Sequence, residues 1–355
     1  MARKRTTLPK DFEAILAAGD LAAMLAVFDS CELDARGGYY KQTALAFRGC
    51  PAALARELVA RGLDVDAVDS YEVAPLARHV GLVAGRELFE TLIDLGADIE
   101  ATSREGLTAL HAAAGSHGSA WAVETLLAHG ARIDVARRVG NYTPLTLAVL
   151  AASDGATEQV IAAAPKARLL LAAGATVAPE VPELVLKTGR AVEFHRRADR
   201  PQPQLDAALA ALYEMFGVDP VPARVGHDGS SAIVVTAEGT SARYRELWNL
   251  LVPSGGPAAT VQGEAIRLTG RIGREILDNG SPNWDDDFRA MTDALTARLG
   301  SATTVTDAAE LDLLRRRVRT GAFDKEAIDR LTELAVAWVV ANPQPQPQPT
   351  PAYRR

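Results

Sequence analysis

Two short sequence marks recur along the first half of the chain at a nearly constant spacing. The first is a Thr/Ala-x-Leu mark that begins at Thr43, Ala74, Thr108 and Thr143, with spacings of 31, 34 and 35 residues. The second begins with a glycine at positions 62, 96, 130 and 174, with spacings of 34, 34 and 44. Two marks that keep one period indicate stacked copies of a single structural unit, which excludes most other folds for this half.

Each repeating unit carries the pattern of short amphipathic helices. In the best-preserved unit, Val123, Leu126 and Leu127 fall on one face of a helix. A single helix pair cannot bury such a face, so neighbouring units are expected to cover it. The repeated glycine follows the stripe, at the place where a left-handed residue ends a helix. The longer last spacing predicts an insertion within residues 153–166.

The repeats resemble the ankyrin repeat. The best match is Gly106-Leu-Thr-Ala-Leu-His-Ala-Ala-Ala114, followed by Val123-Glu-Thr-Leu-Leu-Ala-His-Gly-Ala131. The resemblance covers residues 8–180, about half of the chain. We therefore expect an ankyrin solenoid over residues 8–200, with about five units of which the first and last are degenerate.

The resemblance also suggests a role for His111. It implies that this side chain hydrogen-bonds a neighbouring turn and holds the repeats in register. A metal site is the alternative, but His117 and His129 do not form a recognisable ligand pattern with it. No metal and no other cofactor is expected.

Ankyrin proteins generally bind through the turns that project from the repeats and through the inner helices. Mapped onto this sequence, the projecting turns lie at residues 69–71, 103–105 and 137–142. The candidate partner-binding residues on these turns are Tyr71, Arg104, Glu105, Arg137, Arg138 and Tyr142. Aromatic and arginine side chains are typical anchors of protein interfaces. The alternative is that each of them is only a solvated turn residue.

Longer helical stripes replace the repeat pattern in the second half of the chain. We expect a compact helical domain over residues 205–341, with at most a short strand at residues 232–237. Residues 205–300 resemble a helical region found downstream of ankyrin repeats in bacterial proteins, which supplies no mechanism. The predicted fold class is therefore mostly α: an ankyrin solenoid followed by a compact helical domain.

One expected helix of this domain carries a candidate ligand site. Its core face is predicted to consist of Val261, Ala265, Leu268, Ile272 and Ile276. The candidate ligand residues are Glu264, Arg267, Arg271 and Trp284. Beside the Gly255-Gly256 turn, this set could bind a phosphate or a carboxylate. The alternative is an ion-pair network within or between helices.

Composition narrows the class of partner. The chain has 38 basic and 45 acidic residues and a net charge of −7, which argues against a nucleic-acid partner. No apolar run approaches the length of a membrane span, so no membrane partner is expected. Two cysteines, and the lack of an apolar segment after the basic start, favour a cytoplasmic protein. Only six basic residues are lysines, a bias that suits a GC-rich bacterial genome.

The sequence favours binding over catalysis without excluding an enzyme. No Gly-x-Ser-x-Gly, His-Glu-x-x-His, P-loop or Cys-x-x-Cys motif occurs. We expect a protein-interaction module, either an adaptor or an immunity protein that masks a toxin. The alternative is a small-ligand or enzymatic site in the helical domain, around the candidate ligand residues. Residues 342–355, which are rich in proline and glutamine, are predicted to be a disordered tail.

Overall fold

The computed structural model describes residues 3–81, 85–118, 120–196, 200–303 and 305–354. The chain divides into two compact units. The first comprises Met1–Val192 and Arg197–Val221, and the second comprises Glu193–Arg196 and Pro222–Arg355. Helices dominate both units, and the only sheet in the described ranges has two strands. The predicted mostly α fold class is confirmed.

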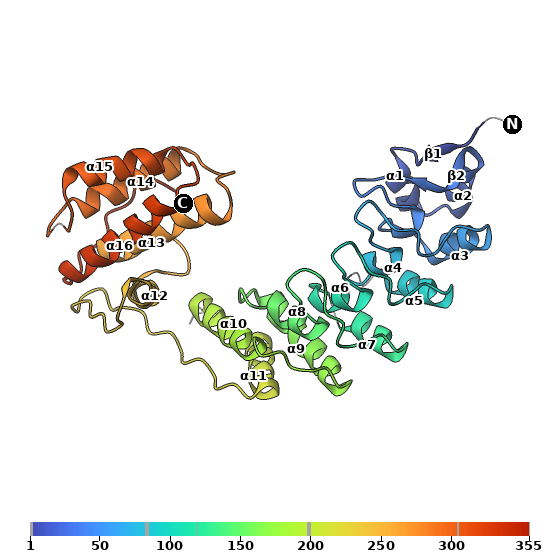
Figure 1. The fold of residues 1–355 in the computed structure, drawn as a ribbon, viewed down its shortest axis with the longest axis horizontal. Coiled ribbons are helices and arrows are strands. Elements are labelled where there is room, and N and C mark those ends of the chain that lie inside the picture. The colour runs from blue at the N-terminus through green and yellow to red at the C-terminus, as the bar shows by residue number, and fades with distance from the viewer. Residues whose placement is uncertain (1–2, 82–84, 119, 197–199, 304, 355) are drawn as a thin grey trace. The chain divides into compact units, whose positions relative to one another are not determined.

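The first unit is a stack of short helices, coloured blue to yellow in Figure 1. Strands β1 (Arg5–Thr7) and β2 (Cys31–Arg36) pair in parallel at its start. The first helices are α1 (Phe12–Ala17), α2 (Leu21–Ser30), the 3₁₀ turn η1 (Ala44–Ala46), α3 (Ala52–Ala60), α4 (Pro75–Arg78) and α5 (Arg86–Asp94). The stack continues with α6 (Ala109–Gly115), α7 (Trp121–Ala128), α8 (Pro144–Ala151), α9 (Thr157–Ala172), α10 (Val181–His195) and α11 (Pro203–Phe216).

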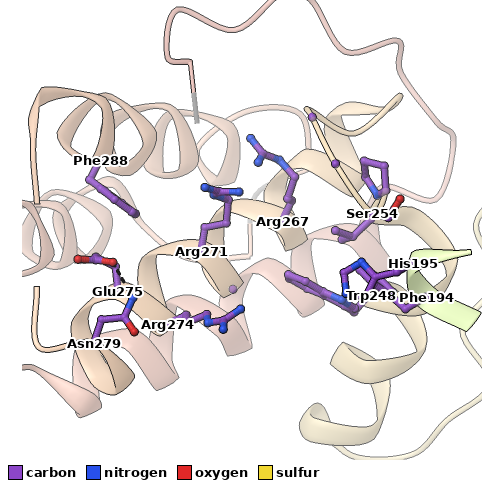
Figure 2. A pocket seen from close by; sticks show the side chains of 15 residues that line it. Phe194, His195, Trp248, Ser254, Arg267, Arg271, Arg274, Glu275, Asn279 and Phe288 are labelled. Atoms are coloured by element: carbon purple, nitrogen blue, oxygen red, sulfur yellow. Dashed lines mark hydrogen bonds between the residues drawn. The ribbon is translucent and has the colours of Figure 1, made fainter. Parts of the chain in front are cut away.

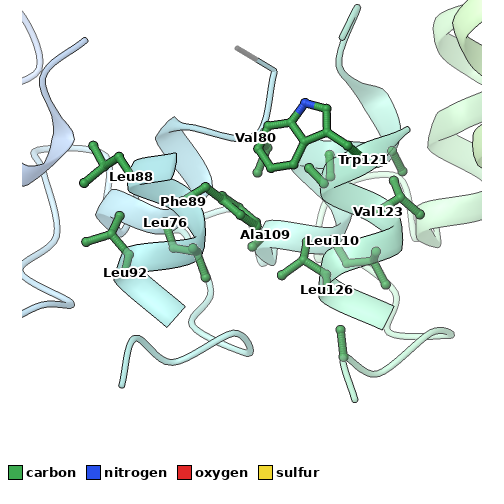
Figure 3. Close-up of a cluster of buried hydrophobic side chains, with 14 of the residues drawn as sticks. Leu76, Val80, Leu88, Phe89, Leu92, Ala109, Leu110, Trp121, Val123 and Leu126 are labelled. Atoms are coloured by element: carbon green, nitrogen blue, oxygen red, sulfur yellow. The ribbon is translucent and has the colours of Figure 1, made fainter. Parts of the chain in front are cut away.

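Neighbouring repeats share one continuous apolar core, as the helical stripes predicted. Figure 3 shows the join between α4–α5 and α6–α7, where Phe89 lies close to the indole of Trp121. Their ring centroids are 5.1 Å apart in an edge-to-face arrangement. Leu92 and Leu110 are buried around them. Aromatic pairs of this geometry add stability beyond area burial, so each repeat depends on the next.

The threonine of the first mark is a helix cap. The Thr108 hydroxyl accepts the backbone N–H of His111 in the first turn of α6, and its Oγ1 lies 2.8 Å from Nδ1 of the same histidine. Burial lowers the pKa of His111, while backbone groups of Val135 and Tyr142 act in the opposite direction. The hydrogen bonds of the His111 ring join its Nδ1 to Thr108 of the same helix, and its Nε2 has no hydrogen-bond partner among the described residues. The register role that the resemblance implied therefore stays a prediction.

In its first three copies, the second mark has an acidic residue four positions after its glycine, and this residue links one repeat to the next. The carboxylate of each of these three residues accepts a backbone N–H from the following repeat. The pairs are Asp66 with Asp98 at 3.1 Å, Glu100 with Arg132 at 2.7 Å, and Asp134 with Thr176 at 3.0 Å. The last pair forms despite the longer spacing, so the insertion does not interrupt this series of hydrogen bonds between repeats, which we call the repeat ladder.

The inserted residues extend an outer helix. Helix α9 has 16 residues, whereas α7, its counterpart in the preceding repeat, has eight. Lys166 on α9 is fully buried and donates to the backbone carbonyl of Ser116, beyond the end of α6. Burial lowers the pKa of this ammonium to about 8. The insertion therefore places one desolvated cation inside the stack.

The boundary between the two units falls later than the sequence predicted. Helix α11 was expected to open the helical domain, but Leu209 and Leu212 belong to the core of the first unit. This helix packs on α9 and extends the first unit to Val221. Its apolar stripe gave no sign of which neighbour would cover it.

The second unit is a bundle of five longer helices in its described part. They are α12 (Thr240–Leu251), α13 (Val261–Gly273), α14 (Asp286–Leu299), α15 (Ala308–Arg319) and α16 (Lys325–Ala341). A single π-helical turn, Arg274–Asp278, follows α13.

The short strand expected at residues 232–237 does not form. Its backbone groups bond to separate partners instead of a neighbouring strand. Ile233 N–H donates to the Pro343 carbonyl at 2.8 Å. The N–H groups of Thr236 and Ala237 donate to the Glu246 carboxylate at 3.0 and 2.7 Å. The Glu246 side chain of α12 thus accepts the hydrogen bonds that the backbone of a second strand would otherwise accept.

The proline- and glutamine-rich tail differs from its predicted disorder. It lies along the start of α13, where the Gln262 amide donates to the carbonyls of Asn342 and Gln344 at 3.0 and 2.6 Å. The Gln262 carbonyl accepts the Gln346 N–H at 3.0 Å. Farther on, Tyr353 is 5% exposed. The Gln262 side chain, 80 or more residues away in the sequence, thus supplies hydrogen-bond partners for the backbone of the tail.

Candidate functional site

The projecting turns of the first unit are linked backbone to backbone. Arg104 N–H donates to the Tyr71 carbonyl at 3.4 Å, and Arg138 N–H donates to the Glu105 carbonyl at 2.9 Å. Ser70 N–H makes the equivalent bond to the preceding turn at 2.9 Å. The turns therefore form one continuous surface, which we call the turn surface.

Three tyrosines stand together at one end of the turn surface. Tyr39, Tyr40 and Tyr71 are 82%, 39% and 49% exposed. Ring centroids lie 5.1 Å apart for Tyr39–Tyr40 and 5.8 Å apart for Tyr40–Tyr71. The neighbouring Tyr39 raises the pKa of Tyr71. We call these three residues the tyrosine cluster.

Tyr71 was predicted from the sequence, whereas Tyr39 and Tyr40 were missed. A usable signal was present, because Tyr40 precedes Tyr71 by 31 residues, the spacing that also separates the first two copies of the first mark. The repeat containing Tyr40 is degenerate, so its turn was not aligned with the others. Extending the period one unit backwards would have placed both tyrosines on the turn surface.

The other predicted turn residues are mostly engaged with one another. The Arg104 guanidinium lies 3.3 Å from the Glu72 carboxylate of the preceding turn. Arg137 reaches Glu105 at 3.9 Å and sits over the Tyr142 ring at 5.2 Å from its centroid. The ion pairs cross from one repeat to the next, so these residues stabilise the turn surface as well as being exposed on it.

In the second unit, Glu264 is the centre of a buried polar network. Its carboxylate accepts a bidentate pair from Arg267 at 2.8 and 2.7 Å. The Tyr353 hydroxyl and the Ala258 N–H add bonds at 2.7 and 2.8 Å. Burial alone would raise the pKa of Glu264, but these donors outweigh it and hold the pKa below its usual value. Glu264 thus forms an ion-pair network of the kind that was the alternative to a ligand site.

A pocket of about 370 Å³ is lined in part by α13 and the π turn that follows it. Its lining includes Arg267, Arg271 and Arg274 from this helix and its π turn, together with Trp248 and the Gly255–Gly256 turn. Figure 2 shows the three arginines leaving one stretch of helix, with the indole of Trp248 beside them. Two of the predicted ligand residues, Arg267 and Arg271, are thereby brought together. We call this cavity the α13 pocket.

Trp284, the remaining predicted ligand residue, lies elsewhere. Its ring stacks on Phe288 with centroids 5.1 Å apart, and its Nε1 donates to the Arg319 carbonyl at 3.1 Å. Neither Trp284 nor Glu264 is among the described residues that line the α13 pocket. Trp284 joins α14 to the end of α15 and supports the bundle.

The glycines of α13 allow close approaches to the neighbouring helix. A Cβ at Gly270 would overlap the Trp248 ring, and one at Gly263 would lie 2.9 Å from the Leu251 carbonyl. Helix α12 therefore packs directly against the backbone of α13. This contact fixes the position of the indole at the pocket wall.

Other candidate chemistry in the described residues is sparse. The Asp285 side chain caps α14 by accepting the Phe288 N–H at 3.2 Å. Burial raises the pKa of Cys50 to about 12, which keeps this thiol protonated. Within the described ranges, no cluster of three or more His, Cys, Asp or Glu side chains could hold a metal ion. No described helix is long and apolar enough to cross a membrane.

Comparison with known proteins supports the repeat assignment. Residues 76–168 match the family model of ankyrin repeats in three copies. The crystal structure of an ankyrin repeat domain from Acinetobacter baumannii is 22% identical and has a TM-score of 0.39, over 57% of this chain and 96% of that domain. No curated protein is significantly similar in sequence. By the family match, residues 76–168 contain ankyrin repeats, which in general are protein–protein interaction modules.

Proposed function

We propose that the first unit binds a partner protein through the turn surface, with the tyrosine cluster as its anchor. The observation that carries this proposal is the exposure of three adjoining tyrosines on two adjacent turns. Tyrosine offers a large contact area with few rotatable bonds and is enriched among interface residues that dominate affinity.

The rigidity of the cluster supports the same proposal. The Arg78 guanidinium lies 4.1 Å from the centroid of the Tyr40 ring. Arg78 is itself held by an ion pair with the buried carboxylate of Asp69. A surface whose side chains are already fixed loses less conformational entropy when a partner binds. The candidate residues that continue this surface along the later repeats are Arg104, Glu105, Arg137, Arg138 and Tyr142.

Two kinds of protein would use such a surface. An adaptor brings its partner to another molecule and leaves the partner active. An immunity protein covers the working site of a toxin and silences it. The two are distinguished by assaying the captured partner alone and in the complex, because only the second kind abolishes the partner's activity.

The experiment is affinity capture from extracts of the source cells with the full-length chain. The variant Tyr39→Ala/Tyr71→Ala removes the anchor, and Phe323→Ala is the matched control, because Phe323 is a 71% exposed aromatic residue in the second unit. We expect the tyrosine variant to bind the captured partner at least about 30-fold more weakly, the size of a strong interface residue. Equal retention by the wild type and the tyrosine variant would refute the proposal.

A further inference from the structure

We infer that the start of α13 is a receptor site for proline-rich segments of partner proteins, and that the tail is its resting occupant. The site consists of residues 259–262, Glu264 and Arg298, and we call it the tail site. A partner segment in which proline alternates with other residues binds there by displacing the tail. This role goes beyond the proposed binding at the turn surface and does not depend on it.

The tail pairs with the tail site as an added strand does. Val261 N–H donates to the Gln346 carbonyl at 2.8 Å, and Gln348 N–H donates to the Ala259 carbonyl at 2.9 Å. The two bonds run in opposite directions between the same two segments, which is the antiparallel pattern. Addition of an extended peptide to free backbone groups is a common mode of peptide recognition.

Proline fits the tail positions that this pairing leaves without a bond. Pro347 forms an antiparallel bridge with Thr260. Because the flanking residues make the bonds, position 347 belongs to a pair at which the N–H points away from the partner. Proline therefore costs no hydrogen bond there, and its fixed φ lowers the entropy that a docking segment loses. A peptide with proline at every second position matches the site.

Gln262 shows most clearly that the site is built for a peptide backbone. Its side chain is fully buried, and its three hydrogen bonds all go to the tail backbone, at Asn342, Gln344 and Gln346. If no peptide lay there, the amide would lose all three bonds, and a buried amide without partners is costly. The side chain both donates and accepts, as a peptide backbone requires of its receptor.

The tail binds mostly through its main chain, so another segment can replace it. Among residues 342–354, Tyr353 is the one buried residue, and Gln344, Gln346 and Pro347 are exposed. Any peptide that reaches the same positions can make the same main-chain bonds. A segment with few buried side chains also opens at a lower free energy than the helices beneath it. Exchange therefore does not require the bundle to unfold.

Two side chains of the site add a preference for sequence. Glu264 accepts the Tyr353 hydroxyl at 2.7 Å, and the tyrosine belongs to the apolar core of the unit. Arg298 donates to Oε1 of Gln348 at 3.3 Å. The preferred ligand therefore has a side-chain acceptor directly after the proline at position 347 and a tyrosine five residues after that acceptor.

The test is fluorescence anisotropy with a labelled peptide of residues 343–353 as the probe. The tethered tail competes with the probe, so the apparent affinity falls with the fraction of sites that are open. Tyr353→Ala weakens the tethered tail and leaves the site intact, so we expect this full-length variant to bind the probe at least about tenfold more tightly than the wild type. Phe323→Ala, at an exposed aromatic residue of the same unit, is the control and should match the wild type.

Altered probes test the recognition without changing the protein. N-methylation of Gln346 and Gln348 removes two donated bonds and should weaken binding at least about tenfold. N-methylation of Gln344, whose N–H makes no hydrogen bond within the described residues, is the matched control. A probe with Gln344→Ser and Gln346→Ser should bind about as tightly as the original, since both side chains are exposed and the site binds their main chain.

Four results would overturn the inference. The first is no saturable binding by the wild type up to about 1 mM probe, because the tail would then not be displaceable. The second is equal binding of a probe with the same composition in scrambled order. The third is equal weakening by N-methylation at Gln344 and at the other two glutamines. The fourth is a dimer in sedimentation that the probe dissociates, which would assign the site to the tail of a second copy. Circular dichroism checks the fold of each variant, and the altered probes decide the question on the wild type alone.

Discussion

The two units use polar residues in opposite ways. In the first unit, carboxylates bond to the neighbouring repeat, 32 or 42 residues along the chain. In the second, Gln262 and Glu264 hold the tail from 82 and 89 residues away. In the first unit, many equivalent hydrogen bonds between neighbouring repeats share the stabilisation. In the second unit, the hydrogen bonds that stabilise the fold are concentrated at the start of α13. A single substitution should therefore destabilise only its own surroundings in the first unit, but should destabilise several helices in the second.

We expect the greatest loss of stability at Glu264. Glu264→Ala leaves Arg267 as a buried charge without its bidentate partner and leaves the Tyr353 hydroxyl without its acceptor. Breaking a buried pair in this way costs about 3–5 kcal/mol. Hydrogen exchange should speed up throughout α13 and α16, with the first unit unchanged.

The control for that prediction is an exposed ion pair in the same unit. Glu333→Ala removes one of the two carboxylate partners of Arg330 on the surface of α16, and exposed pairs are worth about 0–1 kcal/mol. If Glu264→Ala is as mild as Glu333→Ala, the second unit does not depend on its central network.

Lys166 makes the stability of the first unit depend on pH. Its pKa is lowered by burial to about 8 from an ordinary value of 10.5. Between these values the unfolded chain binds more protons than the folded one, so stability rises with pH across this window. The gain is on the order of 3 kcal/mol at 1.36 kcal/mol per pKa unit.

Urea unfolding of the wild type and Lys166→Met, compared at several pH values from 7 to about 10.5, isolates this contribution from other titrating groups. The wild type should gain stability relative to the variant as the pH rises. Parallel curves for the two proteins would show that the ammonium is not desolvated in the folded state.

A smaller effect is expected where the tail meets the bundle. Tyr353→Phe removes one hydroxyl from Glu264 and keeps the ring in place. Loss of a buried bond to a charged group costs about 1.5–3 kcal/mol, and the remaining donors to Glu264 favour the lower end. Thermal unfolding and proteolysis of the tail measure the change; a tail cleaved equally fast in both proteins would contradict its docking.

The repeat ladder should tolerate change best. Asp134→Ala removes the acceptor of the Thr176 N–H and hydroxyl, at 3.0 and 2.7 Å. This should cost about 1 kcal/mol, with faster exchange confined to the turns around residues 134 and 176. Asp94→Ala, at an exposed position on α5, is the control. Faster exchange in the early repeats as well would show that the hydrogen bonds between repeats do not act locally.

The first unit was well predicted from the sequence because its contacts repeat with the sequence. The spacing of Thr108 and Thr143 marked the helix caps, and the glycine marks located the ends of the outer helices. The tyrosine cluster was found only in part, because its first turn lies in a degenerate repeat. The ladder carboxylates were visible as a pattern, but only the structure assigned their partners.

The second unit was harder to predict because its contacts join distant segments. The helices followed from local patterns, and the pairing of Arg267 with Glu264, three residues away, is of the kind stated as the alternative to a ligand site. The docking of the tail did not follow from local patterns. A proline-rich composition describes the segment alone and says nothing of the α13 residues that bind it. The Gly255–Gly256 turn and Arg271 line the same pocket, whereas Trp284 is not among the described residues that line it.

Hydrogen exchange of the full-length chain, alone and bound to the captured protein, decides whether the turn surface holds the partner. We predict slower exchange at residues 38–42, 69–73 and 103–106 in the complex, with α3, α5 and α7 unchanged. Protection confined to those outer helices or to the second unit, with the turns unchanged, would contradict the proposed binding surface.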